Sequence, residues 1–282
     1  MSRAAPLPGS ATGAAPKLRL AGVSKRFDLA DGTSTVALHD VSLDVAQGEF
    51  MVIVGPSGCG KTTVLNLLAG LEQPSGGSVR IDARDITAPG PERGVMFQDY
   101  ALFPWQTVAG NVEFGLRYGP AGAGLDTAAR LERTRACIDL VGLAGAAGKY
   151  PHQLSGGMRQ RVALARLLAI EPEVLLMDEP LAALDAQTRL ILQDELLRIW
   201  GQDRPAQERR TVVFITHAID EAVFLADRIA VMTTHPGRIK ALIDVPLPRP
   251  RNDTTRASPE FQALAQHIWS LIRDEAYRAT VA

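Results

Sequence analysis

The amino-acid sequence predicts an α/β fold with a mainly parallel sheet. Three short runs, 50–54, 174–177 and 212–215, are almost entirely apolar, as expected of strands that are buried on both faces. Each of these runs is followed by a segment in which the apolar residues have helical spacing. Such an alternation of strands and helices is typical of a parallel sheet with helices packed on it.

The remaining elements extend this core. Further strands are predicted at 17–23, 37–45, 78–81, 95–98 and 229–232, and helices at 62–71, 109–116, 127–140, 156–170, 187–200, 219–226 and 258–276. The first two predicted strands alternate apolar and polar residues. The expected fold includes an antiparallel β region near the N-terminus. We therefore expect a disordered tail (1–16), one main domain (17–245) with an inserted helical subdomain at about 99–170, and a C-terminal linker and helix (246–282).

The composition restricts the class of protein. Of the 282 residues, 46% are hydrophobic and 22% are charged, which is typical of a globular protein. The net charge of -1 argues against a chain that binds nucleic acid through bulk electrostatics. The two cysteines, Cys59 and Cys137, do not suggest a disulfide framework or a zinc site, and they fit a reducing cytosol.

From the distribution of apolar residues we expect neither a signal peptide nor a membrane span in this sequence. No apolar run approaches the roughly 20 residues that cross a bilayer, and the first 16 residues lack the continuous apolar stretch of a signal peptide. We therefore expect any action at a membrane to require docking on another subunit.

A glycine-rich loop between a strand and a helix matches the pattern G-x-x-x-x-G-K-[ST]. Gly58 and Gly60 lack a Cβ, so the backbone can wrap a phosphate chain with its N–H groups pointing inward. Lys61 can reach the β- and γ-phosphates, and the Thr62 hydroxyl can bind Mg²⁺. A chance glycine turn is the alternative, but the flanking strand and helix disfavour it. The predicted nucleotide contacts of this loop are Gly55, Pro56, Ser57, Gly58, Cys59, Gly60, Lys61, Thr62 and Thr63.

Two acidic residues, Asp178 and Glu179, stand at the end of a buried strand. Phosphoryl transfer needs one acid near the Mg²⁺ ion and one group that orients or deprotonates water. We assign the first task to Asp178 and the second to Glu179. Two acids after an apolar run would alone indicate the start of a loop, but the phosphate loop favours the catalytic interpretation.

A second anion-binding feature lies at Leu154-Ser155-Gly156-Gly157. Ser155 is predicted to cap a helix whose two initial glycines leave backbone N–H groups exposed. A chain that already has a phosphate loop has no evident use for this second helix N-terminus within the same site.

These motifs, in this order, make residues 17–245 resemble the ABC ATPase family, whose signature sequence is LSGGQ; Met158 replaces the usual glutamine. The resemblance implies a P-loop NTPase fold with a RecA-like core. It also implies that two copies enclose two ATP molecules, with Ser155, Gly156 and Gly157 of one copy facing the phosphate loop of the other.

The resemblance assigns roles to further residues. Gln98 matches the glutamine that contacts Mg²⁺ and senses a membrane partner, and Asp185 matches the loop that links the two ATP sites. His217 matches the histidine that contacts the γ-phosphate, although Ala218 stands where many relatives have Asp. Phe27 matches the aromatic residue that stacks on adenine, with a core position as the alternative. The implied catalytic residues are Lys61, Gln98, Glu179 and His217, and the implied Mg²⁺ ligands are Thr62, Gln98 and Asp178.

The residues after Gln98 suggest the kind of ABC protein. Leu102, Phe103 and Trp105 would form an apolar patch, either a docking site for a permease or part of the local packing. Phe103-Pro-Trp105, the segments 90–94 and 235–238, and the Pro-Arg-Pro-Arg tail resemble the nitrate/sulfonate/taurine importers.

That resemblance implies an importer subunit on the cytoplasmic face of the inner (plasma) membrane. Its expected partners are a second copy, a membrane permease and, indirectly, a periplasmic or extracellular solute-binding protein, without nucleic acid. A soluble ABC ATPase of DNA repair or translation, a regulatory subunit without turnover, and a separate-chain exporter are the alternatives.

Overall fold

The computed structural model describes residues 15–29 and 32–281 and contains a larger and a smaller sheet in this part of the chain. The larger sheet has the order β10 (Ile239–Asp244), β9 (Arg228–Met232), β3 (Phe50–Val54), β8 (Thr211–Ile215), β7 (Val174–Asp178) and β6 (Arg93–Met96). Its neighbouring strands are parallel except for β9 and β10. The smaller, antiparallel sheet has the order β2 (Ser34–Val45), β1 (Leu18–Asp28), β4 (Gly76–Ile81) and β5 (Arg84–Asp85).

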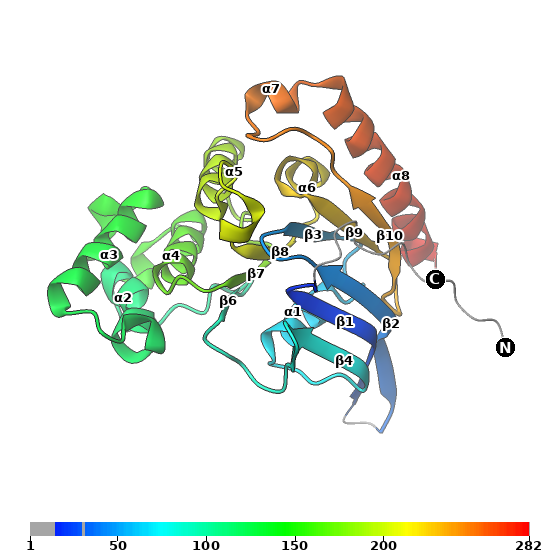
Figure 1. Ribbon diagram of the computed structural model, residues 1–282, viewed down its shortest axis with the longest axis horizontal. Helices are drawn as coiled ribbons and strands as arrows, with labels where there is room; N and C mark the ends of the chain where they lie inside the picture. Colours follow the sequence, from blue (N-terminus) through cyan, green and yellow to red (C-terminus); the bar gives the residue numbers. More distant parts are fainter. Residues whose placement is uncertain (1–14, 30–31, 282) are drawn as a thin grey trace.

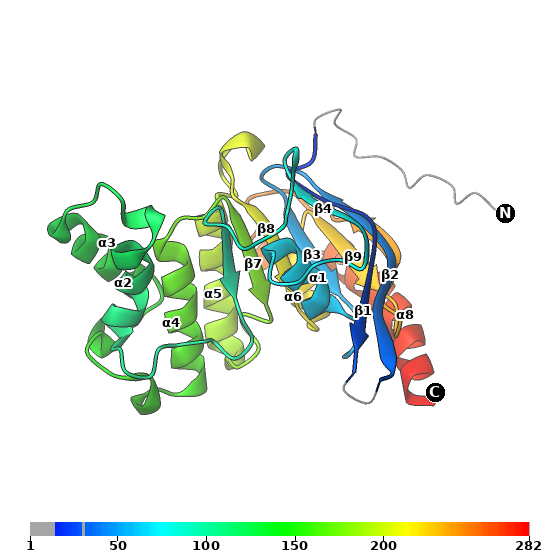
Figure 2. The ribbon, with the colours of Figure 1, turned by 90° about the horizontal axis from the view of Figure 1, so that it is seen from below.

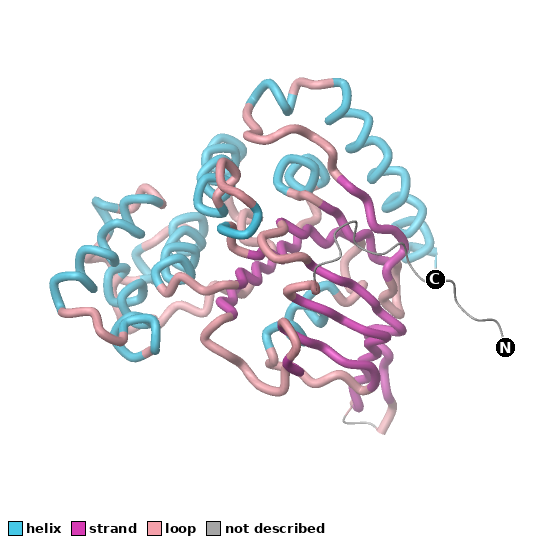
Figure 3. The backbone as a smooth tube through the Cα atoms, viewed as in Figure 1, coloured by secondary structure: helices cyan, strands magenta, loops and turns pink. Residues whose placement is uncertain are grey.

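The helices form two groups around the larger sheet. Helices α2 (Val108–Tyr118), α3 (Thr127–Leu140) and α4 (Gly156–Ala169) gather on one side, beyond β6 (Figure 1). Helices α5 (Ala186–Trp200), α6 (Ile219–Leu225), α7 (Asp253–Arg256) and α8 (Pro259–Val281) lie on the side of the sheet opposite β1, β2 and β4 (Figures 1 and 3). Helix α1 (Lys61–Ala69) lies near the smaller sheet (Figure 2). Short 3-10 helices occupy Pro120–Gly122, Ala144–Ala146, Pro151–Gln153 and Ala206–Glu208.

Strand β3 shows why the apolar runs lack alternation. Met51 and Ile53 pack with α1 and the antiparallel sheet, in one core cluster. Phe50 and Val52 face the opposite way and pack with α5 and α6, in the other cluster. Because side chains on a strand alternate between two faces, and both faces are covered, every position must be apolar.

The predicted α/β fold class is confirmed. The structure differs at β10 and at the two-residue strand β5, neither of which is predicted from the sequence. Strand β10 is the longer of the two. This strand lies at the edge of the larger sheet and its side chains are half-buried, so its pattern is weak. Helix α8 also continues to Val281, five residues beyond the predicted end at 276. The tail expected at 1–16 falls almost wholly outside the described residues.

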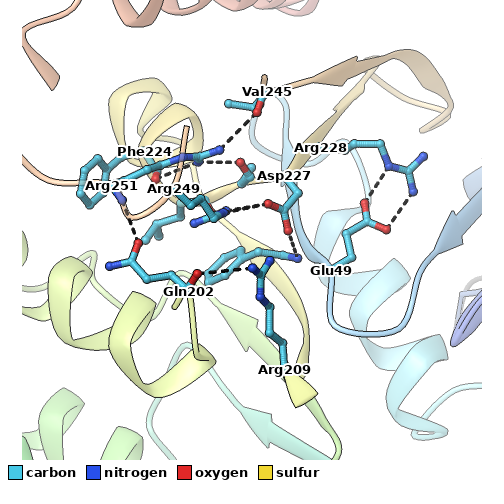
Figure 4. A network of polar contacts seen from close by, with 12 residues as sticks. Glu49, Gln202, Arg209, Phe224, Asp227, Arg228, Val245, Arg249 and Arg251 are labelled. Carbon is cyan, nitrogen blue, oxygen red and sulfur yellow. Dashed lines mark hydrogen bonds and ion pairs between the residues drawn. The ribbon is translucent and has the colours of Figure 1, made fainter. Parts of the chain in front are cut away.

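The proline-rich segment after β10 is bonded to the end of α6 (Figure 4). The last four carbonyl groups of a helix have no partner within it, and here those of residues 223–226 are buried. Arg251 donates to three of these carbonyls at 2.6 to 3.2 Å, and Arg249 donates to the fourth at 2.9 Å. Burial lowers the pKa of Arg251 to about 9, so its guanidinium stays charged at neutral pH. The segment 246–251 is therefore fixed to the domain.

We predict that Arg251→Ala lowers the free energy of unfolding by about 3 kcal/mol, because buried carbonyls of α6 lose charged donors. Urea unfolding measures the change. The matched control is Arg198→Ala, whose side chain is 69% exposed and pairs with Glu195 at the surface. That control should cost less than about 0.5 kcal/mol. Equal losses in both variants would contradict the capping role of Arg251.

Candidate active site

Three neighbouring strands end at the same edge of the larger sheet. The parallel register places Ile53 of β3 beside Ile215 of β8, and Ile215 beside Asp178 of β7. The backbone N–H of Thr216 donates to the Ile53 carbonyl (3.3 Å), and that of Glu179 donates to the Ile215 carbonyl (3.0 Å). The segments that follow these strands therefore begin side by side.

The glycine-rich loop links β3 to α1. Gly58 and Gly60 have φ angles of 77° and 92°, in the left-handed region that favours glycine. A Cβ at Gly60 would also lie 2.7 Å from Cδ2 of Leu38. Helix α1 begins at Lys61, one residue before the predicted start. The buried Lys61 ammonium donates to the carbonyls of residues 55 and 56 at 2.8 and 2.9 Å, so its charge lies within the loop.

The structure brings the three predicted Mg²⁺ ligands together. A surface pocket of about 540 Å³ is lined by Thr62, Gln98 and Asp178 among others. The Thr62 hydroxyl donates to Oδ2 of Asp178 at 2.7 Å. Burial raises the pKa of Asp178, and the charge of Glu179 adds to this effect, while the Thr62 bond and the charge of Lys61 oppose it.

These three side chains suit Mg²⁺, which also binds substrate phosphates, better than they suit a metal ion whose ligands all come from the protein. Among the described residues, no three His, Cys, Asp or Glu side chains form a metal cluster. The chain offers a metal ion only three ligands here: one carboxylate, one hydroxyl and one amide oxygen. That is typical of Mg²⁺, which is usually held by one or two carboxylates together with substrate phosphates.

Glu179 and His217 face each other at this edge. Nδ1 of His217 lies 3.4 Å from Oε2 of Glu179, and the side chains are 67% and 21% exposed. Glu179 has a φ of 49°, a left-handed conformation that costs a non-glycine residue about 1 to 3 kcal/mol and occurs often at functional sites.

Gln160, a residue without a predicted role, also contacts this region through its side chain. Gln160 is buried on α4, and its Nε2 donates to the Glu179 carbonyl at 3.1 Å. Its position, one helical turn before the apolar Ala163 and Leu164, is the only signal that could have revealed it.

The signature segment lies at the start of another helix. Ser155 caps α4 by accepting from the N–H of Met158 (3.3 Å), as predicted. Asp185 caps α5, and hydrogen bonds from Thr188 lower the pKa of the Asp185 carboxyl. Helices α4 and α1 lie apart in Figures 1 and 2, so the signature helix and the phosphate-loop helix of one chain are separated. A Cβ at Gly157 would lie 3.1 Å from Leu184, which places the segment against the loop before α5.

Phe27 and Gln98 are the remaining predicted site residues, and both have side chains that solvent reaches at least in part. Phe27 is partly exposed near the end of β1 and stands outside both core clusters, so the alternative of a core phenylalanine does not hold. The ammonium of Lys25 lies 4.8 Å from the centre of its ring. Gln98 is exposed in the loop that follows β6.

An aromatic surface follows this loop. Trp105, Phe103, Phe114 and Tyr118, the aromatic row, have successive ring-centre separations of 5.6, 4.3 and 5.0 Å. Trp105 is 69% and Tyr118 66% exposed. Local packing therefore accounts for Leu102, which contacts the core, but not for Trp105.

The loop that carries Trp105 is held by a buried amide. Asn111 is fully buried on α2 and accepts from the N–H of Phe103 at 2.8 Å. Its Nδ2 donates to the carbonyls of residues 103, 106 and 107 at 3.0 to 3.2 Å. An exposed indole on such a restrained loop is suited to contact a partner.

Comparison with known proteins identifies the family. The ABC transporter family model matches residues 38–182. The chain belongs to the ABC transporter family. It is 49% identical to the nitrate import ATP-binding protein NrtD of Synechococcus elongatus (77% of each chain covered). It is 42% identical to the aliphatic sulfonates import ATP-binding protein SsuB of Bacillus subtilis (88% and 91%).

Solved structures agree with this assignment. A dimeric ATP-binding cassette bound to ADP and phosphate matches with a TM-score of 0.72 and 32% identity, over 81% of this chain and 98% of that one. The chain is thus an ABC ATP-binding protein, with an ATPase activity coupled to transport. Within the described ranges, no helix has the length and apolarity that a membrane span requires.

We predict that Asp178→Asn stabilises the nucleotide-free chain and weakens its binding of Mg²⁺-ATP. The folded-state pKa of Asp178 lies above its unfolded value, so the ionised carboxylate lowers stability at neutral pH, and this loss disappears as the pH falls. Asparagine removes the buried charge and can still accept from Thr62. Thermal unfolding at pH 7 without nucleotide should show a higher midpoint. A lower midpoint would contradict the burial cost.

Proposed function

We propose that this chain hydrolyses ATP to power the import of a small anion, of the nitrate or sulfonate type, through a separate membrane permease. The observation that carries the hydrolytic part is the shared sheet edge, where the phosphate loop, Asp178–Glu179 and His217 meet. The nitrate and sulfonate import proteins among its relatives support the transport part.

The residues at the sheet edge divide the chemistry of hydrolysis. The N–H groups of the phosphate loop and Lys61 bind the β- and γ-phosphates of ATP. Thr62, Gln98 and Asp178 would hold Mg²⁺, which neutralises charge on the phosphates when bound. Glu179 orients a water molecule and accepts its proton, while His217, 3.4 Å away, contacts the γ-phosphate.

A second copy of the chain completes each ATP site. The signature segment Ser155–Gly157 begins a helix, and the first backbone N–H groups of a helix have no carbonyl partner within it. This helix and α1 lie apart within one chain. In a dimer, Lys61 and Glu179 of one copy face Ser155 and Gly157 of the other across the γ-phosphate. The dimeric cassette with ADP and phosphate supports this arrangement. Asp185 then lies at the dimer contact, and Phe27 stacks on adenine.

The aromatic row is the docking surface for the permease. It starts a few residues after Gln98, so a change at the Mg²⁺ ligand can reach the membrane partner through one short loop. The chain accordingly acts as a peripheral subunit on the cytoplasmic face of the inner (plasma) membrane. A solute-binding protein on the other side delivers the anion to the permease.

We predict that Glu179→Gln retains ATP binding but lowers turnover by about a hundredfold or more, because the water loses its base. A malachite-green phosphate assay measures turnover, and size-exclusion chromatography with ATP should show accumulated dimer. The control is Glu260→Gln, an exposed position on α8. Turnover at the wild-type rate in Glu179→Gln would refute the catalytic assignment.

We predict that Trp105→Gln weakens binding to the permease by about tenfold or more, since an exposed indole at an interface centre contributes strongly to affinity. Co-purification from detergent-solubilised membranes measures the loss. Trp269→Gln is the matched control, because Trp269 is also more than half exposed but lies on α8. If Trp105→Gln fails to fold in thermal unfolding, the aromatic row belongs to local packing.

The same membranes test the class of function. Tagged Glu179→Gln chain, purified with ATP, should retain a multi-span membrane protein, identified by mass spectrometry. Recovery of only soluble proteins or nucleic acid would instead favour a soluble ABC ATPase of DNA repair or translation. Uptake of labelled nitrate or sulfonate into cells that carry the intact system should depend on this chain, and efflux would indicate an exporter.

A further inference from the structure

The turn between β9 and β10, residues 233–238, reaches the phosphate loop. Strand β9 pairs in parallel with β3, so the two strands end together and the turn arrives beside the start of the loop. The turn is closed on itself by Thr233, whose N–H donates to the Arg238 carbonyl at 2.9 Å and whose hydroxyl accepts from the Arg238 N–H at 3.0 Å. The turn is therefore a defined structure on the loop's flank.

Gly237 is the residue of this turn that touches the phosphate loop. Its N–H donates to the Ala37 carbonyl at 2.9 Å, and its carbonyl accepts from the His39 N–H at 3.0 Å. A Cβ at this position would lie 2.1 Å from the carbonyl oxygen of Cys59 and 3.1 Å from Cδ2 of Leu38. Only glycine allows the two backbones to approach so closely.

The contact point matters because of peptide planarity. In a trans peptide the carbonyl oxygen and the following N–H point in opposite directions. The Cys59 oxygen faces Gly237, so the N–H of Gly60 is directed away from the turn. A shift of Gly237 toward the loop would rotate this peptide, and with it one of the N–H groups that can face phosphate.

Helix α8 holds the turn from the other side. Glu275 is 2% exposed, and its Oε2 accepts from the N–H and the hydroxyl of Thr234 at 3.2 and 3.4 Å. Its Oε1 accepts from Nζ of Lys240 at 2.8 Å, and the same ammonium donates to the Leu271 carbonyl at 2.9 Å. The buried Glu275 carboxylate of α8 thus bonds to Thr234, which precedes Gly237 in the chain, and to Lys240, which follows it.

We propose that the β9–β10 turn is a positioning element of the phosphate loop, with Gly237 as its contact residue and Glu275 as its tether to α8. The inference rests on the proposed function, since it takes residues 55–62 as the ATP site. Through this chain of contacts, the C-terminal helix sets the geometry of the loop and therefore the affinity for ATP.

The test compares Gly237→Ala and Glu275→Ala with Gly148→Ala in the full chain. A Cβ at Gly148 would meet no atom within 4 Å, so this variant controls for the substitution itself. ATP affinity is measured by calorimetry well below each melting midpoint, where partial unfolding does not contribute. Hydrogen–deuterium exchange of peptides covering 55–62 reports the loop directly, without any need for turnover.

We expect both test variants to weaken ATP binding by about tenfold or more, because a misplaced binding group loses most of its contribution. Exchange in 55–62 should accelerate in both, with Gly148→Ala at wild-type values. Wild-type affinity and exchange in Gly237→Ala overturn the proposal. If only Glu275→Ala keeps the wild-type ATP affinity and exchange, the role of Glu275 as a tether to α8 is overturned. Glu275→Ala also tests that role if Gly237→Ala does not fold.

Lys61→Ala separates this inference from the proposed function. Loss of ATP affinity in Lys61→Ala together with wild-type values in the two test variants would refute only the positioning role of the turn. Retained affinity in Lys61→Ala would refute the ATP site itself, whatever the turn does.

Discussion

The parallel register of β3, β8 and β7 is the constraint on which the site depends. It fixes which residues leave the sheet together. The phosphate loop therefore meets two acids and a histidine that all lie more than 100 positions later in the sequence, with contacts of 2.7 Å between Thr62 and Asp178 and 3.4 Å between Glu179 and His217. Both faces of these strands are covered by core side chains, and a slip of one residue would turn every side chain to the wrong face. The hydrophobic core therefore determines the geometry of the chemistry.

Much of the site could be predicted from the sequence, because its reactive residues directly follow the strands that position them. The phosphate loop follows its strand directly, as do Asp178 and Glu179, so recognising the apolar run also locates the reactive end. Parallel strands then imply that such ends meet at one edge. For the same reason the sequence predicts Ser155 as a helix cap, because the cap and the helix that it starts form a single short pattern.

The features that escaped prediction depend on residues far apart in the chain or on backbone conformation. Gly237 meets Cys59 across 178 positions, and a glycine in a turn does not reveal what lies opposite. Strand β10 is an edge strand with half-buried side chains, so its pattern is weak. The left-handed backbone of Glu179 is invisible in a sequence, because nothing in a glutamate signals a positive φ.

Arg249 and Arg251, which donate to the carbonyls at the end of α6, limit the positions at which a chimeric protein can be joined. Related cassettes could exchange their C-terminal extensions, and the last core strand at 244 would be an obvious junction. A cut there would separate α6 from Arg249 and Arg251, and the incoming segment would have to supply donors at the same places. A junction after residue 251 keeps the helix and its arginines in one parent, so the modular unit extends past the last strand of the sheet.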